Sequence, residues 1–180
     1  MRNFDLRILL GFPLSFILAA GISACSADEC ADNKNSLPLA GFYTMDDGRL
    51  QEVSIDSISV FGVGAPGDSL ILDTASSVSE VYLPFGICSE SSTFVLSYDA
   101  PSLRENGKSP YDVITFNYRK RPEFVSHACG AVYVYEITDI VSTHHFIETV
   151  DCPDGEIGNA DIQNIRIFFK NNIREEDGDR

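Results

Sequence analysis

The turn FVSHACG at residues 124–130 holds the densest group of reactive side chains in the chain, namely Ser126, His127 and Cys129. A histidine beside a serine or a cysteine is the arrangement of a nucleophile and its general base. Ser126 and His127 are adjacent in an extended segment, however, so their side chains should point to opposite sides of a sheet. Because Cys129 is better explained as half of a disulfide, we expect a structural turn and no catalytic residue.

Two other groups have the residue types of metal ligands but lack the required spacing. One is the run of carboxylates Asp151, Asp154, Glu156 and Asp161. Their oxygens suit calcium, yet their spacing differs from that of an EF-hand, and acidic loops are usually only solvated. The other is Cys129 with His127 and Cys30, where neither a CxxC nor an HExxH motif occurs. We therefore expect no metal and no cofactor.

Two surface features could bind a ligand. The basic residues 119–121 could meet a phosphate or an acidic glycan, although they more simply bend and solubilise the end of a strand. Tyr133 and Tyr135 could stack on sugars if they are exposed, although tyrosines of a sandwich more often fill one face of a sheet. The sequence leaves both pairs of alternatives open.

The first 24 residues have the pattern of a bacterial export signal. Arg2 and Arg7 precede an apolar run over residues 8–21, which is too short for a membrane span but fits a secretory signal. Residues 22–25, ISAC, then resemble the bacterial lipobox, whose cysteine is acylated and becomes the mature N-terminus. We predict a signal peptide at residues 1–24 and a lipid anchor on Cys25. An ordinary signal peptide that leaves Cys25 as a free thiol is the alternative.

Four cysteines remain besides Cys25: Cys30, Cys88, Cys129 and Cys152. An even number in an exported protein predicts two disulfides, because the compartments outside the cytoplasm are oxidising. Three pairings are possible, and the residues alone do not choose among them.

Composition limits the partners that the chain can have. The 180 residues carry a formal net charge of −14, and 44% of them are hydrophobic, which is enough for one core. Removal of residues 1–24 takes away Arg2, Arg7 and Asp5, a net +1, so the mature chain stands at −15. Such a charge disfavours nucleic acid and anionic membrane surfaces.

The elements that must position these residues are short strands. Alternating or short apolar runs predict strands near residues 37–44, 50–63, 70–72, 81–83, 93–98, 113–118, 132–137, 146–150 and 162–169. The Asp-Gly pair at residues 47–48 predicts a hairpin, and the apolar parity changes near residues 56–57, which indicates a bulge or a break. No helical period occurs outside the signal peptide. We predict an all-β fold, an antiparallel β-sandwich of Ig-like or Greek-key type, with a small β-barrel as the alternative.

The predicted organisation has four parts. After the signal peptide comes a lipidated N-terminus and tether at residues 25–36, then a single β domain at residues 37–170 and an acidic flexible tail at residues 171–180. The serine and acidic residues at 26–29 resemble a signal for surface display. A periplasm-facing position and a surface-exposed position at the outer membrane are both compatible with them.

Two motifs carry a family resemblance. The segments DVITFNY at residues 112–118 and FVSHACG at residues 124–130, with the early pair Cys25 and Cys30, resemble a Bacteroidota lipoprotein family catalogued as a domain of unknown function, family 6452. The resemblance implies a bridge between Cys30 and Cys129, and by subtraction a second bridge between Cys88 and Cys152. It implies no catalytic role.

The resulting prediction is a non-enzymatic cell-envelope lipoprotein, a structural or interaction module at the outer membrane. The alternative is an accessory lipoprotein that binds a glycan or another nutrient and works with an outer-membrane β-barrel. The expected partners are the membrane, through the lipid anchor, and an outer-membrane protein. An exposed aromatic patch would favour ligand binding, a flat acidic surface would favour a structural role, and a deep cleft joining His127 or His144 to a carboxylate would favour an enzyme.

Overall fold

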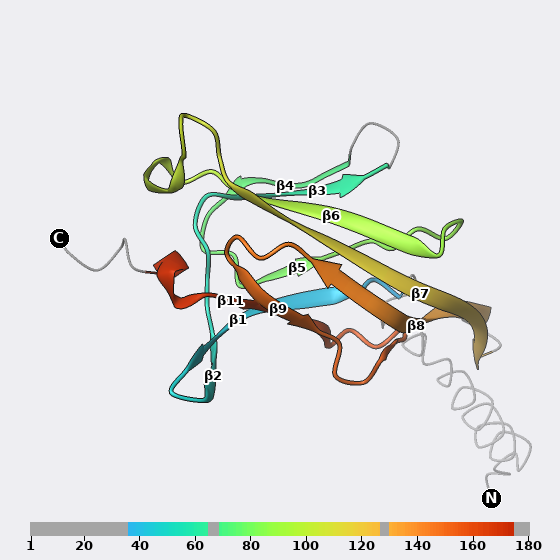
Figure 1. Ribbon diagram of the computed structural model, residues 1–180. Coiled ribbons are helices and arrows are strands. Elements are labelled where there is room, and N and C mark those ends of the chain that lie inside the picture. Colours follow the sequence, from blue (N-terminus) through green and yellow to red (C-terminus); the bar gives the residue numbers. More distant parts are fainter. Residues whose placement is uncertain (1–35, 65–68, 127–129, 175–180) are drawn as a thin grey trace, which may run out of the picture.

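The chain folds as two β-sheets packed face to face. The computed structural model describes residues 36–64, 69–126 and 130–174, which contain strands, two short 3-10 turns and no α-helix. The sheets are separate and do not close on themselves, so the predicted β-sandwich is confirmed and the barrel is not formed. Figure 1 shows β3, β4 and β6 in one layer and β1, β9 and β11 in the other.

The first sheet has the strand order β2-β1-β11-β9, with β5 also paired to β1. Its strands are β1 (Leu39–Asp46), β2 (Arg49–Glu52), β5 (Glu80–Tyr82), β9 (Ile147–Asp151) and β11 (Gln163–Phe169). All pairs are antiparallel except β1 with β11, which run parallel. The first and last strands of the domain therefore lie side by side.

The second sheet has the strand order β10-β8-β7-β6-β3-β4, and all of its pairs are antiparallel. Its strands are β3 (Ile58–Val63), β4 (Ser69–Ala75), β6 (Ser91–Tyr98), β7 (Tyr111–Ser126), β8 (Gly130–Ser142) and β10 (Glu156–Ile157). The 3-10 turns are η1 (Pro101–Leu103) and η2 (Asn171–Arg174). The long β7–β8 hairpin runs diagonally across the molecule (Figure 1).

The core follows the predicted alternation of β6 and β7. Phe94 and Leu96 are buried on β6, and Ile114 and Phe116 are buried beside them on β7. Between the sheets, the ring of Phe85 stacks on that of Tyr118 with centroids 4.7 Å apart. Because successive side chains of a strand face opposite sides, one face of each strand is apolar and the other is half-exposed.

The strand expected over residues 50–63 is two strands in different sheets. β2 belongs to the first sheet and β3 to the second. The segment between them is bonded to β1 through Val53 N and then bridges to Val78 through Ile55. Ser57, with φ at 54°, turns the backbone just before β3. The change in apolar parity therefore marks the crossing between sheets.

β7 differs from the prediction because it does not break at the basic residues. It continues through residues 119–121 to Ser126 and stays paired with β8, with a register shift between Asn117 and Tyr118. A bulge thus lies where the sequence predicts the end of the strand. The tip of the hairpin, residues 127–129, lies outside the described residues.

Several predicted segments also lie outside the described residues. They are the signal peptide, Cys25, nearly all of the tether, and the chain after Arg174. The strands extend from Leu39 to Phe169, inside the predicted domain of residues 37–170. In the part of the chain that the structure describes, no helix has the length and apolar character needed to cross a bilayer.

Candidate functional site

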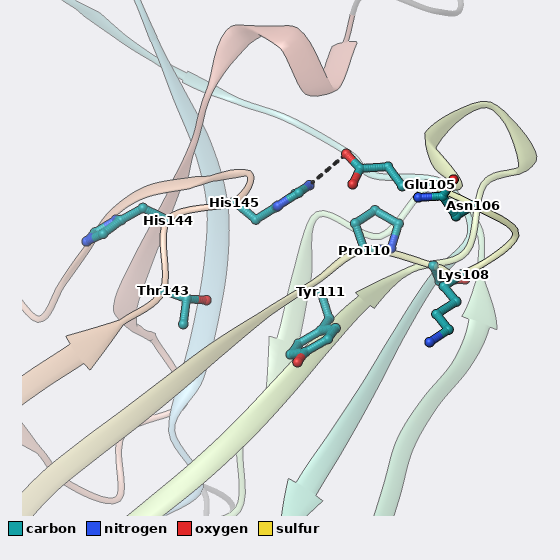
Figure 2. A pocket seen from close by; sticks show the side chains of 9 residues that line it. Glu105, Asn106, Lys108, Pro110, Tyr111, Thr143, His144 and His145 are labelled. Atoms are coloured by element: carbon teal, nitrogen blue, oxygen red, sulfur yellow. Dashed lines mark ion pairs between the residues drawn. The ribbon is translucent and has the colours of Figure 1, made fainter.

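A depression of about 710 Å³ opens at one end of the sandwich, between the β6–β7 loop and the β8–β9 loop. It is lined by Glu105, Asn106, Lys108, Ser109, Pro110, Tyr111, Thr143, His144 and His145. In Figure 2, the side chains from the two loops stand on opposite sides of the start of β7. The lining mixes acidic, basic, amide and aromatic groups, which is the composition of a binding site and not of a core.

The β6–β7 loop presents its side chains on a small hairpin. Glu105 and Lys108 exchange two backbone hydrogen bonds, each of 3.0 Å, around the pair Asn106 and Gly107. Both turn residues have positive φ, 50° and 77°, which asparagine and glycine tolerate in a two-residue turn. The side chains of Glu105 and Lys108 therefore project from a fixed piece of backbone.

The β8–β9 loop is held from inside by the carboxylate of Asp112, the second residue of β7. Asp112 is fully buried, yet its two oxygens have a full set of donors. The donors are Thr143 Oγ1 and His145 N, each at 2.7 Å, Phe146 N at 2.8 Å, Tyr98 Oη at 3.0 Å and Ile147 N at 3.1 Å. The loop that carries both histidines is thus tied to the sheet by one side chain.

These hydrogen bonds keep Asp112 ionised. Burial disfavours the charged carboxylate, but the bonds from the β8–β9 loop outweigh it, so the pKa of Asp112 lies below its usual value. Burial, together with the nearby carboxylate, raises the pKa of the Tyr98 hydroxyl well above its usual value. Asp112 therefore accepts and Tyr98 donates throughout the neutral range.

The outer side of the same loop is fastened by Lys170, which follows β11. Its Nζ donates to the carbonyl oxygens of His144 and His145 at 2.5 and 3.0 Å. The imidazole Nε2 of His145 lies 3.8 Å from Oε1 of Glu105 across the depression, and the two side chains are 39% and 72% exposed. Solvent screens this pair, so it bridges the two loops only weakly.

Some groups that line the depression are committed to other residues of the protein and others are not. The hydroxyl of Thr143 is committed, because it donates to Asp112 and accepts from Val113 N at 2.9 Å. Among the described residues, the side chains of Lys108 and His144 have no protein partner. Figure 2 shows the ring of His144 pointing away from Glu105, so these two do not form an acid–base pair.

The residues of the predicted FVSHACG turn are mostly beyond what the structure describes. His127 and Cys129 lie outside the described residues, as do Cys25 and Cys30, and Ser126 is described only as the last residue of β7. The lipid anchor and the bridge between Cys30 and Cys129 therefore stay predictions.

The predicted bridge between Cys88 and Cys152 is not formed: both are free cysteines, Cys88 exposed and Cys152 half-buried. Cys88 precedes β6 on one side of β7, whereas Cys152 lies in the turn closed by Gly155, which pairs with the outer edge of β8. The two cysteines thus belong to loops at strands of different sheets, β6 and β9, and the fold leaves them unbridged.

The predicted acidic and basic groups are also separated by the fold. Glu156 pairs with Arg121 at 3.0 Å, and Asp161 accepts a hydrogen bond from the hydroxyl of Tyr82 at 2.7 Å, so the acidic segment does not converge on one point. Across the described residues, no group of three histidine, cysteine or acidic side chains is placed to hold a metal ion.

The basic residues 119–121 are largely occupied within the chain. Arg121 contacts Glu123 as well as Glu156, and Lys120 Nζ donates to the carbonyl of Ile87 at 2.5 Å. The charge of Arg121 is thus paired with carboxylates, and Lys120 is held by a carbonyl oxygen. Tyr133 is exposed and Tyr135 is buried, so only the former could meet a ligand.

Sequence reasoning missed the part that Asp112 plays in building the site. A signal for it exists in DVITFNY, because Asp112 has the same parity as Ile114, Phe116 and Tyr118. A charged residue on the apolar face of a strand must be satisfied by hydrogen bonds if it is buried. Its donors come from another loop, which pattern reading does not bring into contact with β7.

The comparisons with known proteins support the predicted family of unknown function. A family model described as a family of unknown function (DUF6452) matches residues 57–169, which is more than half of the chain. The match runs from just before β3 to the end of β11 and includes both loops of the depression. Neither the comparison with curated proteins nor that with solved structures found a match. The chain belongs to the family of unknown function DUF6452.

Proposed function

We propose that this protein is a non-enzymatic lipoprotein of the cell envelope, an interaction module that binds a ligand in the depression at the end of its sandwich. The observation that carries the proposal is the combination of fixed loops with unpartnered side chains. Asp112 holds the β8–β9 loop in place, while the side chains of Lys108 and His144 have no hydrogen-bond or ion-pair partner in the described part of the chain. Because the backbone of both loops is already fixed, a ligand would have to order only these side chains and not the loops.

This geometry favours ligand binding over the two other functions considered. A purely structural module needs no depression lined by nine side chains of mixed character. An enzyme needs a nucleophile or a base close to a partner, whereas Thr143 is committed to Asp112 and His145 is 3.8 Å from an exposed carboxylate. The ligand-binding form of the module is therefore the better account.

The proposed location rests on the sequence. Export by residues 1–24 and acylation of Cys25 would anchor the chain at the outer membrane of a bacterium of the Bacteroidota, facing the periplasm or the cell surface. An outer-membrane protein is the proposed partner there.

The fold would place the depression far from this lipid anchor. A bridge from Cys30 to Cys129, which we retain as a proposal, would bring the tip of the β7–β8 hairpin near the lipid. The depression lies at the opposite end of β7, after roughly 50 Å of strand from Ser126 back to Tyr111. The ligand site would then face away from the bilayer, where solutes or an outer-membrane partner can reach it.

Histidine-selective NMR tests the proposed function directly, because only three histidines occur in the chain and two of them line the depression. The full lipidated protein, labelled with ¹³C-histidine and held in detergent, is titrated with fractions of envelope extract and growth medium. We expect at least one fraction to shift the ring signals of His144 and His145, assigned by single substitutions.

A pair of charge reversals serves as the control. Glu105→Lys should abolish the shift, whereas Glu148→Lys, at an exposed position of β9 in the other sheet, should leave it unchanged. If no fraction moves either histidine signal, or if both reversals act alike, the depression is not a ligand site and the proposed function is wrong.

A further inference from the structure

We infer that the ligand of the depression is an uncharged oligosaccharide, with Tyr111 as the platform for one sugar ring; this inference rests on the proposed ligand-binding function. A pyranose has an apolar face of C–H groups and a rim of hydroxyls. A site for it needs an accessible aromatic ring next to side chains that donate and accept hydrogen bonds. Tyr111 and the loop residues supply both within one open depression.

Tyr111 stands where a sugar ring can reach it. It is the first residue of β7 and is 59% exposed. Its neighbours across the sheet are short, since Ser97 of β6 lies opposite and Ser59 of β3 lies beyond that. These short neighbours and the exposure of Tyr111 leave ring surface available for stacking. An aromatic ring with a polar tip suits a ligand that is apolar on one side and wet on the other.

The polar groups match the rim of a sugar. The carboxylate of Glu105 is mostly exposed and can accept bonds from two neighbouring hydroxyls. Asn106, beside it on the same turn, can donate and accept, and the imidazole of His145 faces the same space in Figure 2. These three groups come from the two loops, so they surround the mouth of the depression on both sides.

Other ligand classes fit this lining less well. A phosphate or a sulfated glycan needs several cations, but the lining holds one lysine and no arginine, and the chain has a net charge of −14. A largely apolar ligand needs an enclosed pocket, which this open depression does not provide. An open site also admits a chain of sugars without requiring a free end.

The test titrates the full lipidated protein in detergent with defined probes. The uncharged probes are hexasaccharides of glucose, mannose and xylose, the anionic probes are a galacturonate oligomer and a heparin hexasaccharide, and the third class is a set of neutral tripeptides. The readouts are the ring signals of His144 and His145 and the heat of binding. We expect at least one uncharged hexasaccharide to bind and to shift both signals, and the anionic probes and peptides to leave them unchanged.

Substitutions of tyrosine then locate the platform. Tyr111→Ala should weaken binding about tenfold or more, because it removes the stacking surface, whereas Tyr111→Phe should keep it within about threefold. Tyr133→Ala removes another exposed tyrosine, on β8, and should have no effect. Equal melting temperatures for the three variants and the parent would show that the loss does not come from unfolding.

The outcomes separate this inference from the proposed function. If the tripeptides or the anionic probes bind and the uncharged sugars do not, the carbohydrate inference fails and the ligand-binding function stands. If an uncharged sugar binds but Tyr111→Ala has no effect, the platform is wrong. If no sugar binds while an envelope fraction still shifts the histidine signals, only the ligand class is refuted; if no fraction and no probe shifts them, both proposals fail.

Discussion

Substitution of Asp112 is the strictest test of how the depression is built, because one carboxylate holds an entire loop. Asp112→Ala would remove the acceptor for five donors, of which Tyr98 Oη, Phe146 N and Ile147 N belong to buried residues. Thr143 and His145 are exposed and can turn to water instead. The loss of folding stability is therefore determined by the three buried donors.

Each buried donor left without an acceptor costs about 1–3 kcal/mol, so the three together cost about 3–9 kcal/mol. A domain of this size has about 5–15 kcal/mol of stability in total. Asp112→Ala is thus expected to be unfolded or close to it. Asp112→Asn can keep its oxygen toward the three buried donors and turn its amide toward Thr143, so we expect a loss of only about 1–3 kcal/mol.

The same carboxylate should make stability depend on pH. Because the pKa of Asp112 is lower in the folded protein than in the unfolded chain, its contribution is fully present above the unfolded value of about 3.9. The contribution is lost as pH falls below that value and through the folded pKa. The difference in stability between the parent and Asp112→Asn should therefore be largest near pH 7 and shrink in acid.

Urea unfolding followed by far-ultraviolet circular dichroism measures both effects, at pH 7 and at a series of lower pH values. Asp139→Asn is the matched control, since Asp139 is an exposed aspartate of β8 in the same sheet. It should change the free energy of unfolding by less than about 0.5 kcal/mol. The proposed role of the carboxylate would be refuted if the free energy of unfolding of Asp112→Ala lay within about 1 kcal/mol of that of the parent. It would also be refuted if the effect of Asp112→Asn did not change with pH.

Three further outcomes are expected. In the native protein without reductant, a maleimide should label Cys88 faster than Cys152, because Cys88 is exposed and burial raises the pKa of the Cys152 thiol. If neither cysteine reacted, the two would be joined in the bridge that the structure lacks. Tyr118→Phe should lower the free energy of unfolding, measured in urea, by about 1–2 kcal/mol, because the hydrogen bonds of the hydroxyl are lost. An effect no larger than that of the exposed control Tyr133→Phe would contradict this expectation. Cys25→Ala should end incorporation of labelled palmitate and release the protein from sedimented membranes, whereas continued labelling would exclude the lipid anchor.

The fold could be predicted largely from local pattern. The alternation over residues 93–98 and 113–118 predicts half-buried strands, because only one face of each can enter the core, and these strands are β6 and β7. The Asp-Gly pair predicts the hairpin between β1 and β2, whose turn residues Asp47 and Gly48 have the positive φ values that such a turn requires. Each of these predictions depends on neighbours in sequence.

What could not be predicted depends on contacts between distant segments. The parallel pairing of β1 with β11 joins the two ends of the domain, and no local pattern specifies it. The basic residues 119–121 look like a break in the sequence, but pairing with β8 and the contacts of Lys120 and Arg121 keep them in a strand. Subtraction paired Cys88 with Cys152, but the fold leaves both free, next to strands of different sheets.

The depression is the clearest case of this limit. Its lining residues look like ordinary loop residues, and the contact that joins the loops, from Asp112 to residues 143–147, spans more than thirty positions. The alternation of inward and outward positions along the strand shows that Asp112 faces the core. A buried charge must then be satisfied by hydrogen-bond donors. The sequence thus contains the requirement, while the identity of the donors comes only from the fold.

The residues that build the site differ from those that would touch a ligand, and β7 carries both kinds. Asp112 near its start fastens the β8–β9 loop, and Tyr118 further along fastens the β5–β6 loop through its bonds to Gly86 and Ser92. Because the sheet supplies these attachments, the side chains of Tyr111, Lys108 and His144 are not needed to hold the loops in place. Tyr111→Ala should therefore weaken binding in a protein that stays stable, whereas Asp112→Ala should remove the site by unfolding it. A protein that showed the reverse would place the binding chemistry in the sheet instead of the loops.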